Sequence, residues 1–141
     1  MSTKKIITIF GATGAQGGGL ARSILADPNG PFAVRAVTRD VNSDAARALA
    51  ANLEDAAAVE RAFAGAYGAY CVTFFWAHFS PERELAEARL MAQAARAAGL
   101  QHVIWSTLED TRRWMQLDDP RMPTLMGRYK VPHFDAKGEA D

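Results

Sequence analysis

The order of apolar and polar residues along the chain predicts alternating strands and helices. Short runs rich in β-branched and aromatic residues are typical of buried parallel strands. Between them, apolar residues recur every three to four positions, which is the period of an amphipathic helix. The expected strands cover residues 5–10, 32–38, 67–76 (with an exit loop) and 101–106, and the expected helices cover residues 15–26, 53–63 and 80–98. This alternation predicts an α/β fold with a doubly wound parallel sheet.

One strand of that pattern is missing. Residues 42–50 form a short helical pattern, and the next helix begins at Leu53 with no β-branched run between them. A doubly wound sheet requires a third strand at this point. Either the strand has been lost, or the sequence skips residues between about Leu49 and Asn52. Skipped residues are the interpretation that we favour.

Composition and charge narrow the class of protein. The chain has 141 residues, 49% hydrophobic and 23% charged, with a formal net charge of zero. This length supports one domain with its own core, which we assign to residues 1–141. Zero net charge argues against direct binding of nucleic acid, and no apolar run approaches the length of a membrane span. The single cysteine, Cys71, is expected in the core and fits a reducing cytoplasm, so we expect a cytoplasmic protein.

The first predicted strand ends in a glycine-rich turn with Gly11, Gly14 and Gly17 at intervals of three residues. In such a turn the first glycine allows a tight bend, the second lets the backbone approach an anion, and the third lets helix and strand pack closely. The helix that follows offers free N–H groups and the positive end of its dipole. The turn therefore predicts a dinucleotide pyrophosphate site. Its expected contacts are Gly11, Thr13, Gly14, Ala15, Gln16 and Gly17.

Arg39 follows the second predicted strand, about twenty residues beyond the glycines, where dinucleotide folds select their cofactor. An acidic residue at this place binds the ribose 2′-hydroxyl of NAD, whereas an arginine accommodates the 2′-phosphate of NADP. Arg39 therefore favours NADP(H). The neighbouring Asp40 leaves NAD(H) open.

Two further strand ends supply candidate cofactor contacts. Thr73, Phe74 and Phe75 follow the third apolar run, and Ser106 ends the fourth. The carboxyl ends of parallel strands form the ligand cleft of open α/β sheets, so we expect these residues to line it. The alternative for the aromatic residues is a place in the core.

The periodic pattern breaks down between Leu108 and Val131 and resumes at Pro132 as the start of a helix. A stretch of this length inside a domain is usually a lid or a disordered loop, and we expect one of these here. The sequence stops at Asp141 soon after the helix begins, which we interpret as the end of an incomplete chain.

These segments together resemble the NmrA-like family, atypical members of the short-chain dehydrogenase/reductase superfamily. The segment 133–139 is the most specific, because the glycine motif is common to the superfamily. The resemblance implies a Rossmann-type domain that prefers NADP(H), followed by a smaller domain for a substrate or a partner protein. It also implies an adenine contact at Asn52, which replaces the usual aspartate. The matching segments are residues 11–18, 37–39, 65–67, 72–73, 106–109 and 133–139.

The resemblance also implies three candidate catalytic residues. Typical reductases of the superfamily use Tyr-x-x-x-Lys, in which the tyrosine passes a proton and the lysine holds the cofactor ribose. Lys137 matches that lysine, and Ser106 matches a serine that steadies the substrate oxygen. His133 stands at the tyrosine position. A histidine can donate a proton near neutral pH, although an imidazole is shorter than a phenol.

Two functions remain open at this point. The first, which we favour because the tyrosine is missing, is an NADP(H)-binding redox sensor whose cofactor occupancy alters contacts with a partner protein. The second is an NAD(P)H-dependent reductase of a small carbonyl, quinone or imine, with Ser106 and Lys137 as its polar pair. The three histidines lack the spacing of metal ligands, so we expect no metal site.

Overall fold

The computed structural model describes residues 3–38, 49–50 and 55–141. The chain forms two compact units. The first unit comprises Met1–Val72 with Leu90–Trp105, and the second comprises Thr73–Arg89 with Ser106–Asp141. The assignment of residues 1–141 to one domain stays a prediction.

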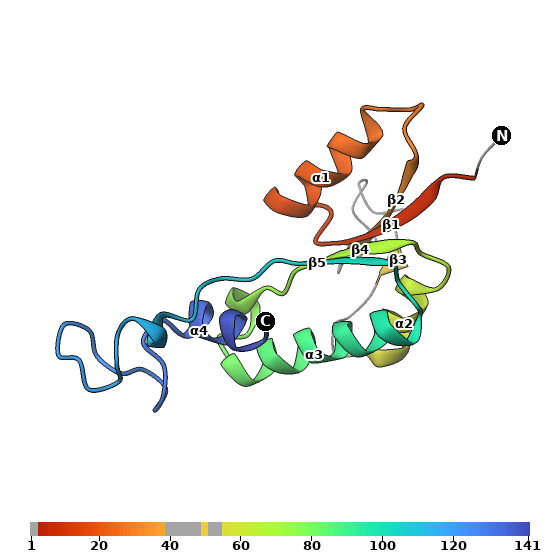
Figure 1. Ribbon diagram of the computed structural model, residues 1–141. Coiled ribbons are helices and arrows are strands. Elements are labelled where there is room, and N and C mark those ends of the chain that lie inside the picture. Colours follow the sequence, from red (N-terminus) through yellow and green to blue (C-terminus); the bar gives the residue numbers. More distant parts are fainter. Residues whose placement is uncertain (1–2, 39–48, 51–54) are drawn as a thin grey trace. The chain divides into compact units, whose positions relative to one another are not determined.

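The first unit is built on a parallel sheet (Figure 1). Its described strands follow the order β3-β2-β1-β4-β5, which matches the first five positions of the 3-2-1-4-5-6 order of a doubly wound sheet. Central β1 pairs with β2 from Lys5 opposite Phe32 onward, and with β4 on its other side. The predicted fold class is confirmed. The strands are β1 (Lys5–Phe10), β2 (Phe32–Thr38), β3 (Leu49–Ala50), β4 (Gly68–Cys71) and β5 (His102–Trp105).

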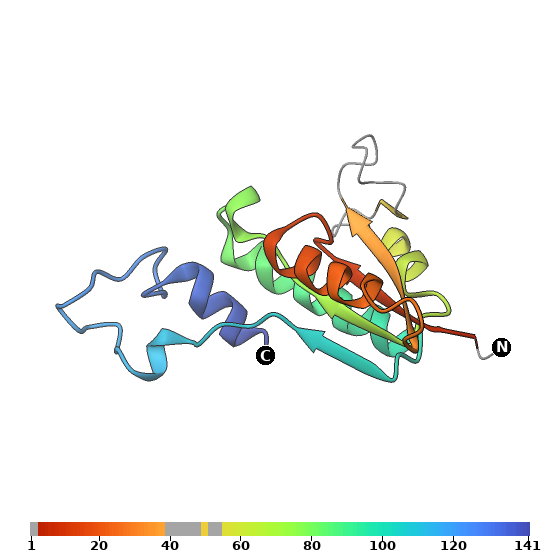
Figure 2. The ribbon, with the colours of Figure 1, turned by 90° about the horizontal axis from the view of Figure 1, so that it is seen from above.

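Helices cover both faces of this sheet (Figure 2). Helix α1 (Ala15–Leu25) lies on one face, and α2 (Ala56–Phe63) lies on the other with the part of α3 (Pro81–Ala97) that follows Leu90. The side chain of Asp55 caps α2 by accepting from Ala57 N at 3.0 Å and Ala58 N at 3.2 Å. Among the described helices, none is both long enough and apolar enough to cross a bilayer.

The core of the first unit lies between β1, β4 and the helices α2 and α3. Phe10 packs edge-on against Phe63, with 5.4 Å between ring centroids. Cys71 is buried there, and burial raises the pKa of its thiol to about 12. The expectation of a buried core cysteine is confirmed. The buried members of this cluster are Phe10, Val37, Ala58, Val59, Ala62, Phe63, Ala69, Cys71, Met91, Ala94 and Ala95.

The third strand corrects the sequence analysis. We expected helix up to Ala50 and no strand at this point, but Leu49 and Ala50 form β3, opposite Val37 and Thr38 of β2. Two residues cannot produce a detectable apolar run, and pairing with β2, not local propensity, decides their conformation. The other residues of the expected helix over 42–50 lie outside the described part of the chain.

The second unit contains η1 (Phe75–Ala77), the start of α3, η2 (Thr111–Arg113) and α4 (Pro132–Glu139). The predicted helix at Pro132 is therefore confirmed. The aperiodic segment before it is anchored by Lys130, whose buried ammonium donates to the carbonyls of Asp119 (3.0 Å) and Met122 (2.6 Å). Its role as a lid stays a prediction.

Candidate functional site

The glycine-rich turn joins β1 to α1 in the first unit. Gly11 has φ +64°, and its carbonyl accepts a hydrogen bond from Gly14 N at 2.8 Å. Gly14 is the N-cap of α1, and no side chain caps the helix. Thr13, Gly14 and Ala15 are exposed, so the first N–H groups of α1 lie at the surface. A helix end of this kind can bind a phosphate through backbone groups alone.

Gly17 fixes the distance between α1 and β1. A β-carbon at this position would lie 2.6 Å from the Gly11 carbonyl oxygen and 2.7 Å from that of Phe10. Backbone atoms at such distances leave no room for a side chain, so the close packing predicted for the third glycine is confirmed. Gly19 lies two residues later in the same helix, and a β-carbon there would have no heavy atom within 4 Å.

Gln16 is held toward the sheet by Tyr70, whose hydroxyl donates to the Gln16 side-chain oxygen at 2.8 Å. A pocket of about 360 Å³ lies between the turn, α1 and β2. Its lining is mainly apolar, and Thr13 of the exposed helix end is part of it. The residues that line it are Ala12, Thr13, Gly18, Ala21, Arg22, Leu25, Val34, Ala36 and Thr38. Two predicted cofactor contacts, Arg39 and Asn52, lie outside the described residues.

The second unit brings together Lys137 and Thr73, two residues predicted at the cofactor cleft. The Lys137 ammonium donates to the Thr73 hydroxyl at 2.6 Å and to the Thr73 carbonyl at 3.2 Å. It also forms an ion pair with Glu84 of α3, with 2.8 Å between Nζ and Oε1. The Thr73 hydroxyl donates to the same carboxylate. All three residues are buried, so this is a compact charged cluster inside the unit.

His133, at the start of α4, lies in an aromatic cluster. Its ring centroid is 4.7 Å from that of Trp76 and 5.8 Å from that of Phe75. Burial lowers the pKa of His133, although the charges of Asp135 and Glu84 act in the opposite direction. Phe75 is buried, which fits a core position, whereas Phe74 and Trp76 are each 52% exposed.

Ser106 is half-buried directly after β5. Its neighbour Thr107 provides a bond to α4, because the Thr107 hydroxyl donates to the backbone carbonyl of Lys137 at 3.2 Å. Gly138 follows in α4, and a β-carbon there would lie 2.5 Å from Asp110 N. The helix that carries Lys137 is therefore packed closely against the segment after β5.

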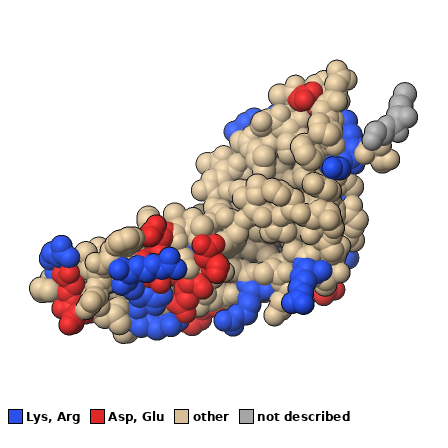
Figure 3. Space-filling view, in the orientation of Figure 1, with Lys and Arg blue, Asp and Glu red and all other residues tan. Residues whose placement is uncertain are grey.

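Salt bridges tie the aperiodic segment to the end of α4. The Arg112 guanidinium lies 2.8 Å from Asp110 and 2.9 Å from Glu139, and Arg128 reaches Glu139 at 3.0 Å. The hydrogen bond from Arg112 holds the pKa of Asp110 below its usual range. On the face shown in Figure 3, charges of both signs are interleaved over the second unit.

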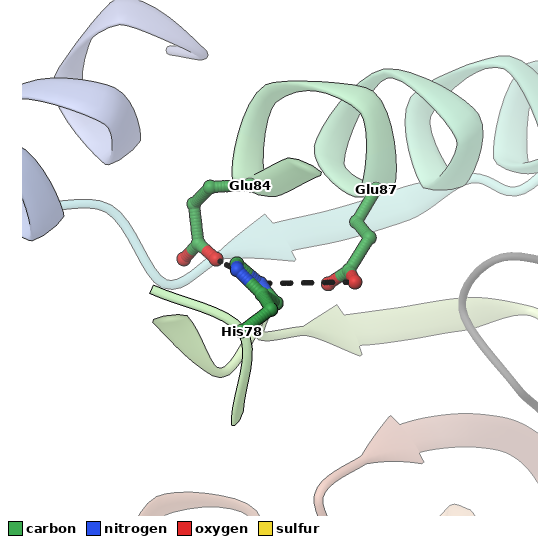
Figure 4. A group of neighbouring side chains, drawn as sticks. All are labelled: His78, Glu84 and Glu87. Carbon is green, nitrogen blue, oxygen red and sulfur yellow. Dashed lines mark ion pairs between the residues drawn. The ribbon is translucent and has the colours of Figure 1, made fainter. Parts of the chain in front are cut away.

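Sequence analysis missed a buried group of His78, Glu84 and Glu87 (Figure 4). His78 Nε2 lies 3.3 Å from Glu84 Oε2 and 3.8 Å from Glu87 Oε1, and none of the three side chains is more than 10% exposed. A signal was present in the sequence. Extending the helical period back from buried Met91 reaches Glu87 and Glu84, so the buried stripe of α3 includes two carboxylates.

The parallel strand order and the glycine turn at the carboxyl end of β1 define a Rossmann-type fold. The chain belongs to the NmrA-like family, whose profile matches residues 3–139. It is 36% identical over 151 residues to the NmrA-like family domain-containing oxidoreductase lnaB of Aspergillus flavus, covering 98% of this chain and 41% of that protein. It is 37% identical over 117 residues to the oxidoreductase hkm9 of Aspergillus hancockii, covering 75% of this chain and 34% of that protein.

Solved structures share the fold. The negative transcriptional regulator NmrA in complex with NADP matches with a TM-score of 0.73 and 23% identity, covering 99% of this chain and 42% of that one. The Citrobacter sp. triphenylmethane reductase complexed with NADP(H) matches with a TM-score of 0.65 and 18% identity, covering 95% and 44%. The chain thus spans less than half the length of these relatives. The alignment with lnaB is also longer than the 141 residues present, so lnaB has additional residues inside the matched region.

Proposed function

We propose that this chain is the dinucleotide-binding part of an NmrA-like protein and that it binds NADP(H) as a redox signal. The exposed, uncapped end of α1 after the glycine turn supports binding of a pyrophosphate. Relatives of this fold are described as complexes with NAD, with NADP and with NADP(H). A reducing compartment such as the cytoplasm is part of the proposal, because the single cysteine is a buried thiol.

The preference for NADP(H) is proposed from Arg39. Replacing Arg39 by Glu puts a carboxylate where the 2′-phosphate would bind and should therefore weaken NADP(H) far more than NAD(H). Titration of wild type and variant with both reduced cofactors, followed by nicotinamide fluorescence, measures this. An equal loss for both cofactors would refute the 2′-phosphate role.

The signalling role is carried by one observation: the proton-donating tyrosine of a typical reductase is replaced by His133, whereas its lysine is kept as Lys137. The sequence contains no Tyr-x-x-x-Lys, and His133 packs on Trp76 in a setting that favours its neutral form. The ammonium of Lys137 already donates to Thr73 and pairs with Glu84. A protein with these features is better suited to holding the cofactor than to rapid turnover.

A second candidate is a reductase of a small carbonyl, quinone or imine. Two observations favour it: the curated relatives are named oxidoreductases, and aromatic side chains lie around His133. Trp76 and Phe79 are more than half exposed, so they offer faces on which a planar substrate can stack. In this function the reduced nicotinamide supplies a hydride, Ser106 and Lys137 form the polar pair, and His133 is the candidate proton donor.

A steady-state assay of NADPH oxidation against a panel of quinones and carbonyls separates the two functions. Turnover above roughly 1 s⁻¹ that is lost in Ser106→Ala or Lys137→Ala would establish the reductase and overturn the sensor. Saturable binding of NADPH without turnover would support the sensor and exclude reduction of the compounds tested.

A further inference from the structure

The first turns of α3 bury two carboxylates, which is unusual for glutamate. Glu84 has no exposed surface and Glu87 is 8% exposed. A buried carboxylate is stable only when charged or polar groups satisfy it. The groups around these two are therefore informative about what the cluster does.

His78 faces the two carboxylates with its Nε2 nitrogen. The backbone N–H of Ser80 donates to His78 Nδ1 at 3.0 Å, so Nδ1 carries no proton and the proton of the neutral ring is on Nε2. Nε2 is the atom that lies 3.3 Å from Glu84 and 3.8 Å from Glu87. A histidine that binds a metal through Nε2 uses a bare nitrogen there and donates from Nδ1. In His78 the bare nitrogen is Nδ1, and Nε2 carries the proton that faces the carboxylates. The group therefore suits a proton at Nε2 and not a metal ion.

Glu84 receives its hydrogen bonds at one oxygen and faces the histidine with the other. Oε2 faces the His78 N–H, while Oε1 accepts from the Thr73 hydroxyl and pairs with the Lys137 ammonium. These contacts satisfy a carboxylate that would be costly to bury without partners. The carboxylate in turn is a partner for the buried ammonium of Lys137.

We propose that Glu84, supported by His78 and Glu87, is a positioning residue that holds the Lys137 ammonium oriented toward the nicotinamide ribose of the dinucleotide. The inference rests on the proposed binding of NADP(H). The Thr73 carbonyl, at 3.2 Å, is farther from the ammonium than the Thr73 hydroxyl and Glu84 are. A ribose hydroxyl replaces this contact, while Glu84 and the Thr73 hydroxyl keep the ammonium in place.

The test compares two ligands, NADPH and 2′,5′-ADP, which lacks the nicotinamide ribose. Glu84→Gln and Lys137→Met should each weaken NADPH binding about tenfold, because the first removes the charged partner of the ammonium and the second removes the ammonium itself. Neither should change the Kd for 2′,5′-ADP. Glu84→Asp keeps the charge and should recover part of the loss. The double variant Glu84→Gln/Lys137→Met should be no weaker than Lys137→Met alone, because the two residues act together.

Two controls make the result specific. Glu82→Gln changes an exposed carboxylate in the same turn of α3 and should leave both affinities unchanged. Glu87→Gln removes only the rear carboxylate, and it should give a smaller loss for NADPH than Glu84→Gln. This milder variant keeps the test valid if Glu84→Gln folds poorly, and circular dichroism checks the fold of each variant.

Several outcomes would overturn the proposal. An unchanged affinity of Glu84→Gln for NADPH removes the positioning role alone, and an equal loss for both ligands shows a merely structural role. A rise in melting temperature with ZnCl2 that His78→Asn abolishes would make Glu84 a metal ligand instead. Folded wild type that binds neither nucleotide would overturn the proposed function itself.

Discussion

The two units of the molecule offer binding groups of different kinds. In the first unit the candidate site is made of backbone: an uncapped helix end, a left-handed Gly11, and Gly17, where a β-carbon would collide with two carbonyl oxygens. In the second unit it is made of side chains, with Lys137, Glu84 and His78 buried together. Backbone sites are sensitive to any added atom, whereas buried ionic sites are sensitive to any change of charge. The two units should therefore respond to different mutations.

The largest effect is expected for Gly17→Ala in the first unit. The new methyl group would lie 2.6 Å from a backbone oxygen, so α1 must move away from β1. We expect a loss of about 3 kcal/mol in the free energy of unfolding, together with loss of nucleotide binding. Urea denaturation measures the free energy of unfolding. Gly19→Ala is the matched control, and it should be neutral or stabilise by up to about 1 kcal/mol, because its site is open and helical. A variant Gly17→Ala as stable as wild type would contradict this account of the turn.

A smaller effect is expected for Asp135→Asn in the second unit, where shape is kept and charge is lost. The buried Asp135 carboxylate accepts from Thr111 N at 2.8 Å, Lys130 N at 2.7 Å and Val131 N at 3.0 Å. An amide keeps only one acceptor oxygen, so at least one buried N–H loses its partner, at a cost of about 2 kcal/mol. Thermal unfolding monitored by circular dichroism measures this loss of stability. Asp118→Asn, at an exposed position in the same unit, is the control and should leave the midpoint unchanged.

The smallest effect is the pH dependence expected from His133. Its pKa in the folded protein is lowered from 6.5, chiefly by burial, so the folded state binds a proton less readily than the unfolded chain. The contribution of His133 to stability is therefore complete above pH 6.5 and declines as the pH falls through the folded pKa. His133→Asn should show a smaller loss of urea midpoint between about pH 7.5 and pH 5.5 than wild type. An identical pH profile for the two proteins would show that other groups account for it.

The contrast between the backbone site of the first unit and the side-chain site of the second also explains which features could be predicted from the sequence. Strand β1, the turn and α1 form one continuous segment whose chemistry is local, so their order and the close packing at Gly17 were predictable. Strand β3 was not predictable, because its two residues are held by pairing with β2 and are too few to form an apolar run in the sequence. The alignment with lnaB contains additional residues of lnaB, so this chain is shorter than lnaB within the matched region.

The buried ionic cluster was harder to predict for another reason. Lys137 and Thr73 are 64 positions apart, and only the fold brings them together. Glu84 and Glu87 occupy positions in a helical stripe that sequence reasoning reserves for apolar residues. His133 and Lys137 were identified from the resemblance alone, and neither apolar periodicity nor charge pattern gives the carboxylate behind Lys137.

Binding of a nicotinamide dinucleotide at the glycine turn is measured by titrating NADPH into wild type, Gly17→Ala and Gly19→Ala and following nicotinamide fluorescence. We predict saturable binding to wild type and Gly19→Ala, and loss of binding in Gly17→Ala. Wild type that is folded but does not bind, or Gly17→Ala that binds as tightly as Gly19→Ala, would contradict this prediction.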